Sequence, residues 1–165
     1  PNKLRNDFYQ CLDLVRIRQM VSNGMAEQIA RGIDFKVFKV TVDGKNYCYK
    51  ESLRGFKPAI KQALEYKSLL ERLGWYNFDF IAPFEVGVSR AESRMLAENP
   101  KITIVMPWLE EITKHAFHQV VGLEKSIFDI GVKKQLAEKG FKLRDTIQVG
   151  IYANRPYIYD LSSIE

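Results

Sequence analysis

The sequence predicts an α+β fold, and three observations support this. Hydrophobic periodicity switches several times along the 165 residues between helical and extended spacing. An Asp43-Gly44 pair, the strongest short-range hairpin signal, lies within a run of β-branched and aromatic residues. The composition, 46% apolar and 27% charged without repeats or low-complexity tracts, is typical of one domain. The predicted order is helix, hairpin, helix, two strands, helices and hairpin, which is an α+β order.

The first half of the chain supplies the first helix, the hairpin and the second helix. A helix is predicted over residues 6–21, where apolar residues recur at near-helical spacing up to Ser22-Asn23-Gly24. Two antiparallel strands are predicted on either side of Asp43-Gly44, within residues 35–51. A helix of about four turns follows, because Pro58 suits a helix start and Gly74 ends the periodic run.

The second half supplies two further strands, more helix and a last hairpin. Extended segments are predicted within residues 80–90 and 101–109. Residues 111–140 are helical in pattern, with a break at Gly122. The last segment is predicted to turn back at Ala153-Asn154.

Composition limits the classes of function. Cys11 and Cys48 are too few for a disulfide framework, and no Cys/His cluster has the spacing of a zinc site. No apolar run approaches the ~18 residues that cross a bilayer, and the opening residues lack a signal-peptide core, so we expect a soluble protein without a membrane span. The net charge of +5 favours anionic partners such as nucleotides, but no basic block favours nucleic acid.

The candidate functional residues are charged side chains at predicted strand ends and in loops. No Walker loop, HExxH, nucleophile elbow or GxGxxG motif is present. The remaining candidates are Lys50, Glu65, Arg144-Asp145 and Asp160. Taken singly, each has an ordinary structural explanation, such as a strand end, a solvated helix charge or a turn cap. Their order along the chain supports a functional interpretation.

In that order the sequence resembles the protein-kinase-like fold, from about Gly32 to Leu161. Lys50 at the end of the first hairpin matches the nucleotide-binding lysine, and Glu65 on the following helix matches its ion-pair partner. Residues 101–111 resemble the fifth strand and hinge. This resemblance puts Met106 at the gatekeeper position and Pro107, Trp108 and Leu109 along the adenine edge.

The resemblance continues through the catalytic motifs. Leu143-Arg144-Asp145 stands where kinases have HRD, so Asp145 matches the catalytic aspartate. Asp160-Leu161-Ser162 stands for DFG, so Asp160 matches the metal ligand. The glycine loop retains only Gly32, and the metal-binding asparagine has no clear match, Gln148 being the nearest amide.

Five residues follow Asp160, so the resemblance is closest to the minimal kinases that bacterial pathogens inject into host cells, of the HopBF type. It implies an antiparallel N-lobe sheet with one regulatory helix over residues 32–109, and a strongly reduced helical C-lobe over 110–165. Residues 1–31 would be an extension that braces the sheet or binds a partner.

The implied activity is that of a serine/threonine protein kinase using ATP and Mg²⁺, secreted as an effector that acts on a host protein such as the HSP90 chaperone. Lys50 would hold the α- and β-phosphates with help from Glu65, Asp160 and Gln148 would coordinate magnesium, and Asp145 would orient the substrate hydroxyl. Two alternatives stay open: a pseudokinase that acts as a binding module, and a small-molecule or lipopolysaccharide-type kinase.

Overall fold

The fold is mixed α+β, as the sequence predicts, and forms two structural units. The computed structural model describes residues 3–29, 34–53, 56–57, 59–89, 100–144 and 147–165. The first unit comprises Pro1–Asn77 and Pro83–Trp108, and the second comprises Phe78–Ala82 and Leu109–Glu165. No helix within the described ranges has the length and apolar character to cross a membrane.

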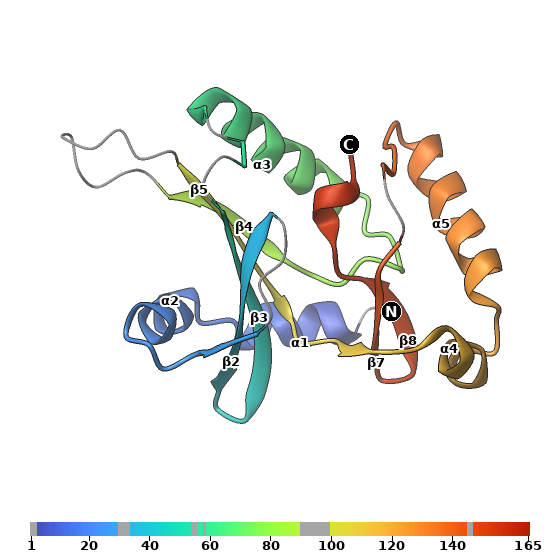
Figure 1. The fold of residues 1–165 in the computed structure, drawn as a ribbon, viewed down its shortest axis with the longest axis horizontal. Helices are drawn as coiled ribbons and strands as arrows, with labels where there is room; N and C mark the ends of the chain where they lie inside the picture. Colours follow the sequence, from blue (N-terminus) through green and yellow to red (C-terminus); the bar gives the residue numbers. More distant parts are fainter. Residues whose placement is uncertain (1–2, 30–33, 54–55, 58, 90–99, 145–146) are drawn as a thin grey trace. The chain divides into compact units, whose positions relative to one another are not determined.

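The first unit is built on a five-stranded antiparallel sheet (Figure 1). Its strands, in the spatial order β1-β2-β3-β5-β4, are β1 (Glu27–Gln28), β2 (Phe35–Val42), β3 (Lys45–Ser52), β5 (Lys101–Pro107) and β4 (Glu85–Ser89). The predicted hairpin is confirmed: Asp43 and Gly44 adopt φ of 50° and 77°, the left-handed backbone that a two-residue type I′ turn requires.

Two N-terminal helices cover one face of this sheet. The prediction of a single helix over residues 6–21 is wrong, because α1 (Lys3–Cys11) and α2 (Leu14–Ser22) are separate. Asp13 starts the second helix, since its carboxylate accepts a hydrogen bond of 3.1 Å from the Arg16 N–H. Phe8 and Ile17 are buried in one apolar cluster with side chains of β2, β3 and β5, so residues before β2 brace the sheet.

The helix α3 (Ile60–Trp75) packs against β4 and β5. Its buried side chains recur at helical spacing: Ala63, Tyr66, Leu70 and Leu73. Because side chains alternate along β5, Ile102, Ile104 and Met106 lie on the opposite face from Val105, which belongs to the cluster under α1 and α2. The predicted start at Pro58 lies outside the described residues, and the helix ends one residue beyond the predicted Gly74.

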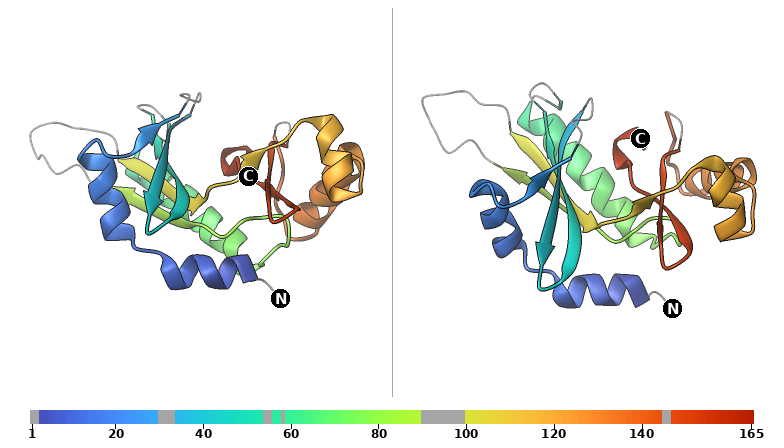
Figure 2. Two further views of the ribbon diagram at one scale, coloured as in Figure 1. Left: turned by 90° about the horizontal axis from the view of Figure 1, so that it is seen from below. Right: turned by 60° about the horizontal axis from the view of Figure 1, so that its bottom comes forward.

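The second unit combines two helices, a small sheet and a final turn of 3-10 helix (Figure 2). Gly122, with φ of 76°, ends the first helix where the sequence predicts the break. The predicted turn is also confirmed, since Ala153 and Asn154 have φ of 49° and 62°. The elements are β6 (Glu110–Glu111), α4 (Lys114–Val121), α5 (Lys125–Glu138), β7 (Val149–Tyr152), β8 (Arg155–Ile158) and η1 (Leu161–Ser163).

Candidate functional site

Lys50 lies on an apolar face of the sheet. It stands in β3 opposite Val37 of β2 and Ile104 of β5, and its residue exposure is only 9%. Cys48, two residues earlier, points to the same face and pairs in register with Met106. Burial raises the pKa of the Cys48 thiol, while the Lys50 cation nearby acts in the opposite direction. An ammonium group so far removed from water attracts an anion strongly.

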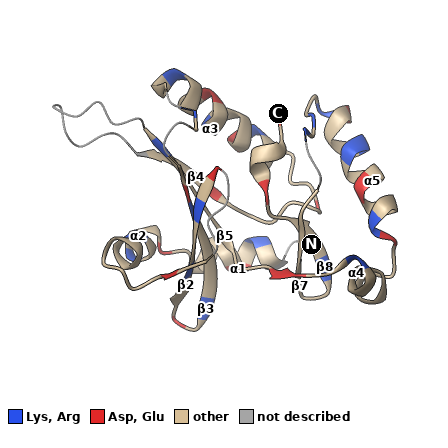
Figure 3. Ribbon diagram, in the orientation of Figure 1, with Lys and Arg blue, Asp and Glu red and all other residues tan. Residues whose placement is uncertain are grey.

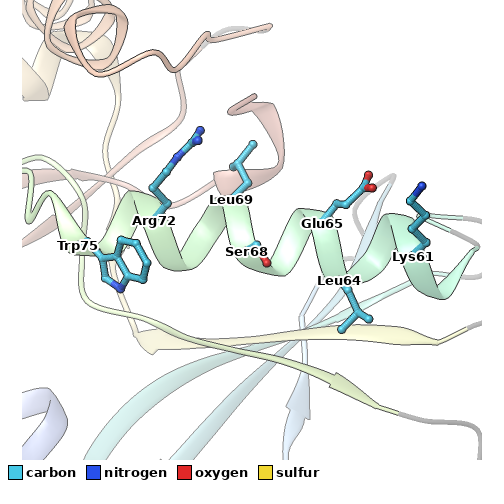
Figure 4. Close-up of a pocket in the computed structure, with 7 residues that line it drawn as sticks. All are labelled: Lys61, Leu64, Glu65, Ser68, Leu69, Arg72 and Trp75. Atoms are coloured by element: carbon cyan, nitrogen blue, oxygen red, sulfur yellow. The ribbon is translucent and has the colours of Figure 1, made fainter.

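Glu65 is exposed on α3 and is not brought to Lys50. It lies away from the buried side of the helix, on the rim of a shallow hollow (Figure 4). The ion pairs formed among the described residues of this unit include Lys67 with Glu71 but none between Lys50 and Glu65. The hollow is lined by Lys61, Leu64, Glu65, Ser68, Leu69, Arg72 and Trp75.

The residues predicted along the hinge follow directly from β5. Met106 is 1% exposed and lies on the same face as Lys50. The Trp108 N–H donates a hydrogen bond of 3.1 Å to the Asn46 carbonyl, and the Lys39 ammonium lies 4.9 Å from the centre of the Trp108 ring. Leu109 is buried and is the first residue of the second unit after β5. The Trp108 amide is thus engaged with β3.

Asp160 follows β8 and caps the short helix η1. Its Oδ1 accepts hydrogen bonds from the Ser162 N–H at 3.1 Å and from the Ser162 hydroxyl at 2.5 Å. The preceding N–H, that of Tyr159, donates at 3.3 Å to the Gln148 carbonyl, so Gln148 and Asp160 lie at the same end of the β7–β8 hairpin. One carboxylate oxygen of Asp160 is held in place. Gln148 is exposed and in register with Tyr159, so strand alternation puts its side chain on the opposite face from that of Asp160.

A second backbone pairing brings the predicted catalytic loop next to the segment after Asp160. The Lys142 and Glu165 backbones exchange two hydrogen bonds of 2.8 Å, and the Arg144 N–H donates to the Ser163 carbonyl at 2.9 Å. An ion pair of 2.7 Å between Arg144 Nε and Glu165 Oε1 accompanies this pairing. Leu143 forms a β-bridge here with Ile164. This pairing could not be predicted from the sequence, because each segment is too short to show strand periodicity.

Two of the predicted residues are not described. Asp145 and Gly32 both lie outside the described residues. Arg144, the described residue before Asp145, is placed by the hydrogen bond from its N–H to the Ser163 carbonyl.

In the second unit, the Asp160 carboxylate is an oxygen donor of the kind that hard cations prefer. No group of three or more His, Cys, Asp or Glu side chains gathers at one place among the described residues. Asp160 contributes one carboxylate, whereas the predicted second ligand, Gln148, has its side chain on the opposite face of the hairpin. Mg²⁺ commonly takes one or two carboxylates together with waters and substrate phosphates, so Asp160 fits such a site without Gln148.

Charge is spread over both units. Lys and Arg are found on helices and strands of each unit, interspersed with Asp and Glu (Figure 3). Such a distribution favours binding of a small anion at a particular lysine more than binding of a long polyanion.

A scan of protein-family models found none that matches the chain, and a search of curated proteins found no match either. Function is therefore inferred from the residues of the chain itself.

Proposed function

We propose that this chain is a phosphotransferase of the minimal protein-kinase type, which uses ATP and Mg²⁺ and phosphorylates serine or threonine in a protein. The order of elements in the first unit supports the proposal. Lys50 lies in the third strand of the antiparallel sheet, and one helix, α3, separates that strand from the fourth. The fifth strand ends with Met106 and Pro107, and Trp108 follows it directly.

The observation that carries the proposal is the pairing of residues 142–144 with residues 163–165. A kinase needs its catalytic aspartate and its metal-binding aspartate to act on one phosphoryl group. The pairing joins Arg144, the residue before Asp145, to the segment after Asp160. It supports the proposal because two segments that carry kinase-like motifs lie side by side in one unit.

Each group would have a role that follows from its charge and surroundings. Lys50 would hold the α- and β-phosphates, and its apolar neighbours would strengthen the attraction. Asp160 would hold Mg²⁺ without help from the Gln148 side chain, and the bound ion would neutralise phosphate charge. Asp145 would orient the substrate hydroxyl and accept its proton. The exposed Glu65 is not paired with Lys50, and the proposal does not depend on it.

A second candidate is a pseudokinase that binds nucleotide without transferring phosphate. The exposed position of Glu65 favours it, because kinases require the lysine–glutamate ion pair for activity. This candidate retains Lys50 as a phosphate-binding cation but predicts no phosphate transfer.

The experiment is a transfer assay with radiolabelled ATP and Mg²⁺. Three acceptor arms separate the substrate classes: the protein alone, purified HSP90 chaperone, and a lipopolysaccharide or small-sugar mixture. HSP90 is included because the resemblance implies it, together with secretion into a host cell. Label on HSP90 supports the proposal, whereas label on the sugar fraction alone refutes the protein-kinase part of it.

Variants assign the activity to the site. Lys50→Met and Asp160→Asn are expected to lower transfer by about 10²-fold or more. Lys36→Met, whose side chain lies over Phe38 on the other face of the sheet, and Asp79→Asn, an exposed acid in the second unit, should stay within about twofold. Transfer that persists in both site variants would refute the assignment. Absence of transfer, with a nucleotide-dependent rise in Tm that Lys50→Met removes, would establish the binding module.

A further inference from the structure

The outer side of α3 leaves large apolar side chains in contact with solvent. Ile60, Leu64 and Trp75 are 52%, 49% and 78% exposed, and Trp75 has the highest exposure among the large apolar residues described. Leu64 and Trp75 lie across the helix from its buried side chains and line the hollow of Figure 4. An apolar patch rimmed by charge on a soluble surface is typical of an interaction site, and tryptophan is the residue most often central to one.

The residues around this patch are spaced almost evenly on either side of Ser68. Glu65 lies three residues before Ser68 and Arg72 four residues after it, while Lys61 and Trp75 each lie seven residues away. At 3.6 residues per turn, residues seven apart lie nearly in line along one side of a helix. A second α3 running antiparallel, centred on Ser68, would therefore place Glu65 opposite Arg72 of the second copy.

The same antiparallel arrangement matches the ends of the helix. Trp75 of one copy would meet Lys61 and Leu64 of the other, so that an aromatic face packs on an aliphatic side chain beneath an ammonium group. A parallel arrangement would instead put Glu65 beside Glu65 and leave like charges together. The small side chain of Ser68 at the centre lets the two helices approach closely.

We propose that α3 is the contact surface of an antiparallel homodimer with two-fold symmetry, in which each Trp75 packs against Leu64 and Lys61 of the other copy. Such an interface is isologous, because the same patch serves both copies. Arg72 also makes a contact within its own chain, and a guanidinium group with five donors can serve both contacts. The proposal is independent of phosphate transfer.

The size of the surface sets the expected affinity. The 16 residues of α3 span about 24 Å, so one helix face buries less than the ~800 Å² per partner of a standard interface. We therefore expect a dissociation constant in the range of roughly 10 to 100 μM. The charge pairs fix the orientation of the two helices more than they add affinity.

The test is sedimentation equilibrium of the full chain over about 1 to 300 μM, with circular dichroism to verify that each variant is folded. The wild-type protein should dimerise within this range. Trp75→Ala should weaken association at least roughly tenfold. Val15→Ala, which trims a side chain of 66% exposure on α2, should leave it within about twofold.

Charge reversal distinguishes the antiparallel dimer from other arrangements. Glu65→Arg and Arg72→Glu should each weaken association, because each puts like charges opposite one another, and the double variant should recover it. A monomer at all concentrations would overturn the proposal. A double variant no tighter than either single variant, or Val15→Ala as damaging as Trp75→Ala, would overturn it as well.

Discussion

Replacing Gly150 with alanine should destabilise the second unit, because β6 runs close to this residue. A Cβ built at Gly150 would lie 2.5 Å from the Cβ of Leu109 and 3.4 Å from the Glu110 carbonyl oxygen. Both neighbouring atoms belong to the backbone or lie next to it, so neither can swing aside as a flexible side chain would. Relief requires β6 and β7 to separate, and overpacking of this kind costs about 1 to 3 kcal/mol.

A second glycine provides a matched control with the opposite sign. Gly131 lies inside α5, and a Cβ there would meet no atom within 4 Å. Alanine has a better helix propensity than glycine by about 0.5 to 1 kcal/mol, so Gly131→Ala should stabilise. The same chemical change in one unit therefore lowers stability at Gly150 and raises it at Gly131.

Thermal unfolding by far-ultraviolet circular dichroism measures both effects. Fluorescence would not, because Trp75 and Trp108 both belong to the first unit. For a chain of this size a change of 1 kcal/mol shifts Tm by about 2 to 4 °C, so Gly150→Ala should lower Tm by about 2 to 12 °C and Gly131→Ala should raise it by about 1 to 4 °C. A Tm for Gly150→Ala equal to that of wild type would show that β6 does not approach β7 so closely.

Two further predictions concern titratable groups. The exposed thiol of Cys11 should react with a thiol reagent in the native protein. Cys48 is 8% exposed and its pKa is raised by burial, so it should react at least about 10²-fold more slowly until the protein unfolds. Equal reaction rates of the two thiols in the native protein would contradict the buried position of Cys48. Burial also raises the pKa of Tyr49, Tyr157 and Tyr159 above the ordinary value of 10.0. Because the pKa is raised on folding, the folded state keeps its phenolic protons to a higher pH than the unfolded state does. The contribution of these protonated tyrosines to the free energy of unfolding is therefore full below pH 10 and is lost as the pH rises through the folded pKa values. The urea midpoint should therefore fall between pH 9 and pH 11.5 as tyrosinate absorbance rises, and an unchanged midpoint would refute the burial.

Local backbone chemistry explains which elements the sequence predicts well. Asp43-Gly44 and Asn154 tolerate positive φ, so the two hairpins could be located from residue type alone. Helix spacing located α3, and Gly122 marked the end of α4. The buried side of α3 was not predicted, because the apolar residues that recur at helical spacing in the sequence, Ile60, Leu64 and Leu69, are exposed or half-buried. Asp13 was missed as an N-cap, because in a periodic apolar run a single aspartate resembles an ordinary exposed residue.

Features that depend on distant partners could not be predicted in this way. The strands β1 and β6 have two residues each, and only pairing with β2 and β7 defines them. The same distinction between local and long-range features applies to the candidate site. The order of charged residues located Lys50 and Asp160, but neither the outward position of Glu65 nor the pairing of residues 142–144 with 163–165 has a local signature.

The pairing of residues 142–144 with 163–165 closes the intervening segment, residues 145–162, by backbone hydrogen bonds at its two ends. Extra residues inserted at the hairpin turn, Ala153-Asn154, would lengthen this segment but leave the Leu143–Ile164 bridge intact. Deleting residues 163–165 would remove these hydrogen bonds and part of η1, the short helix that Asp160 caps, while leaving α4 and α5 intact.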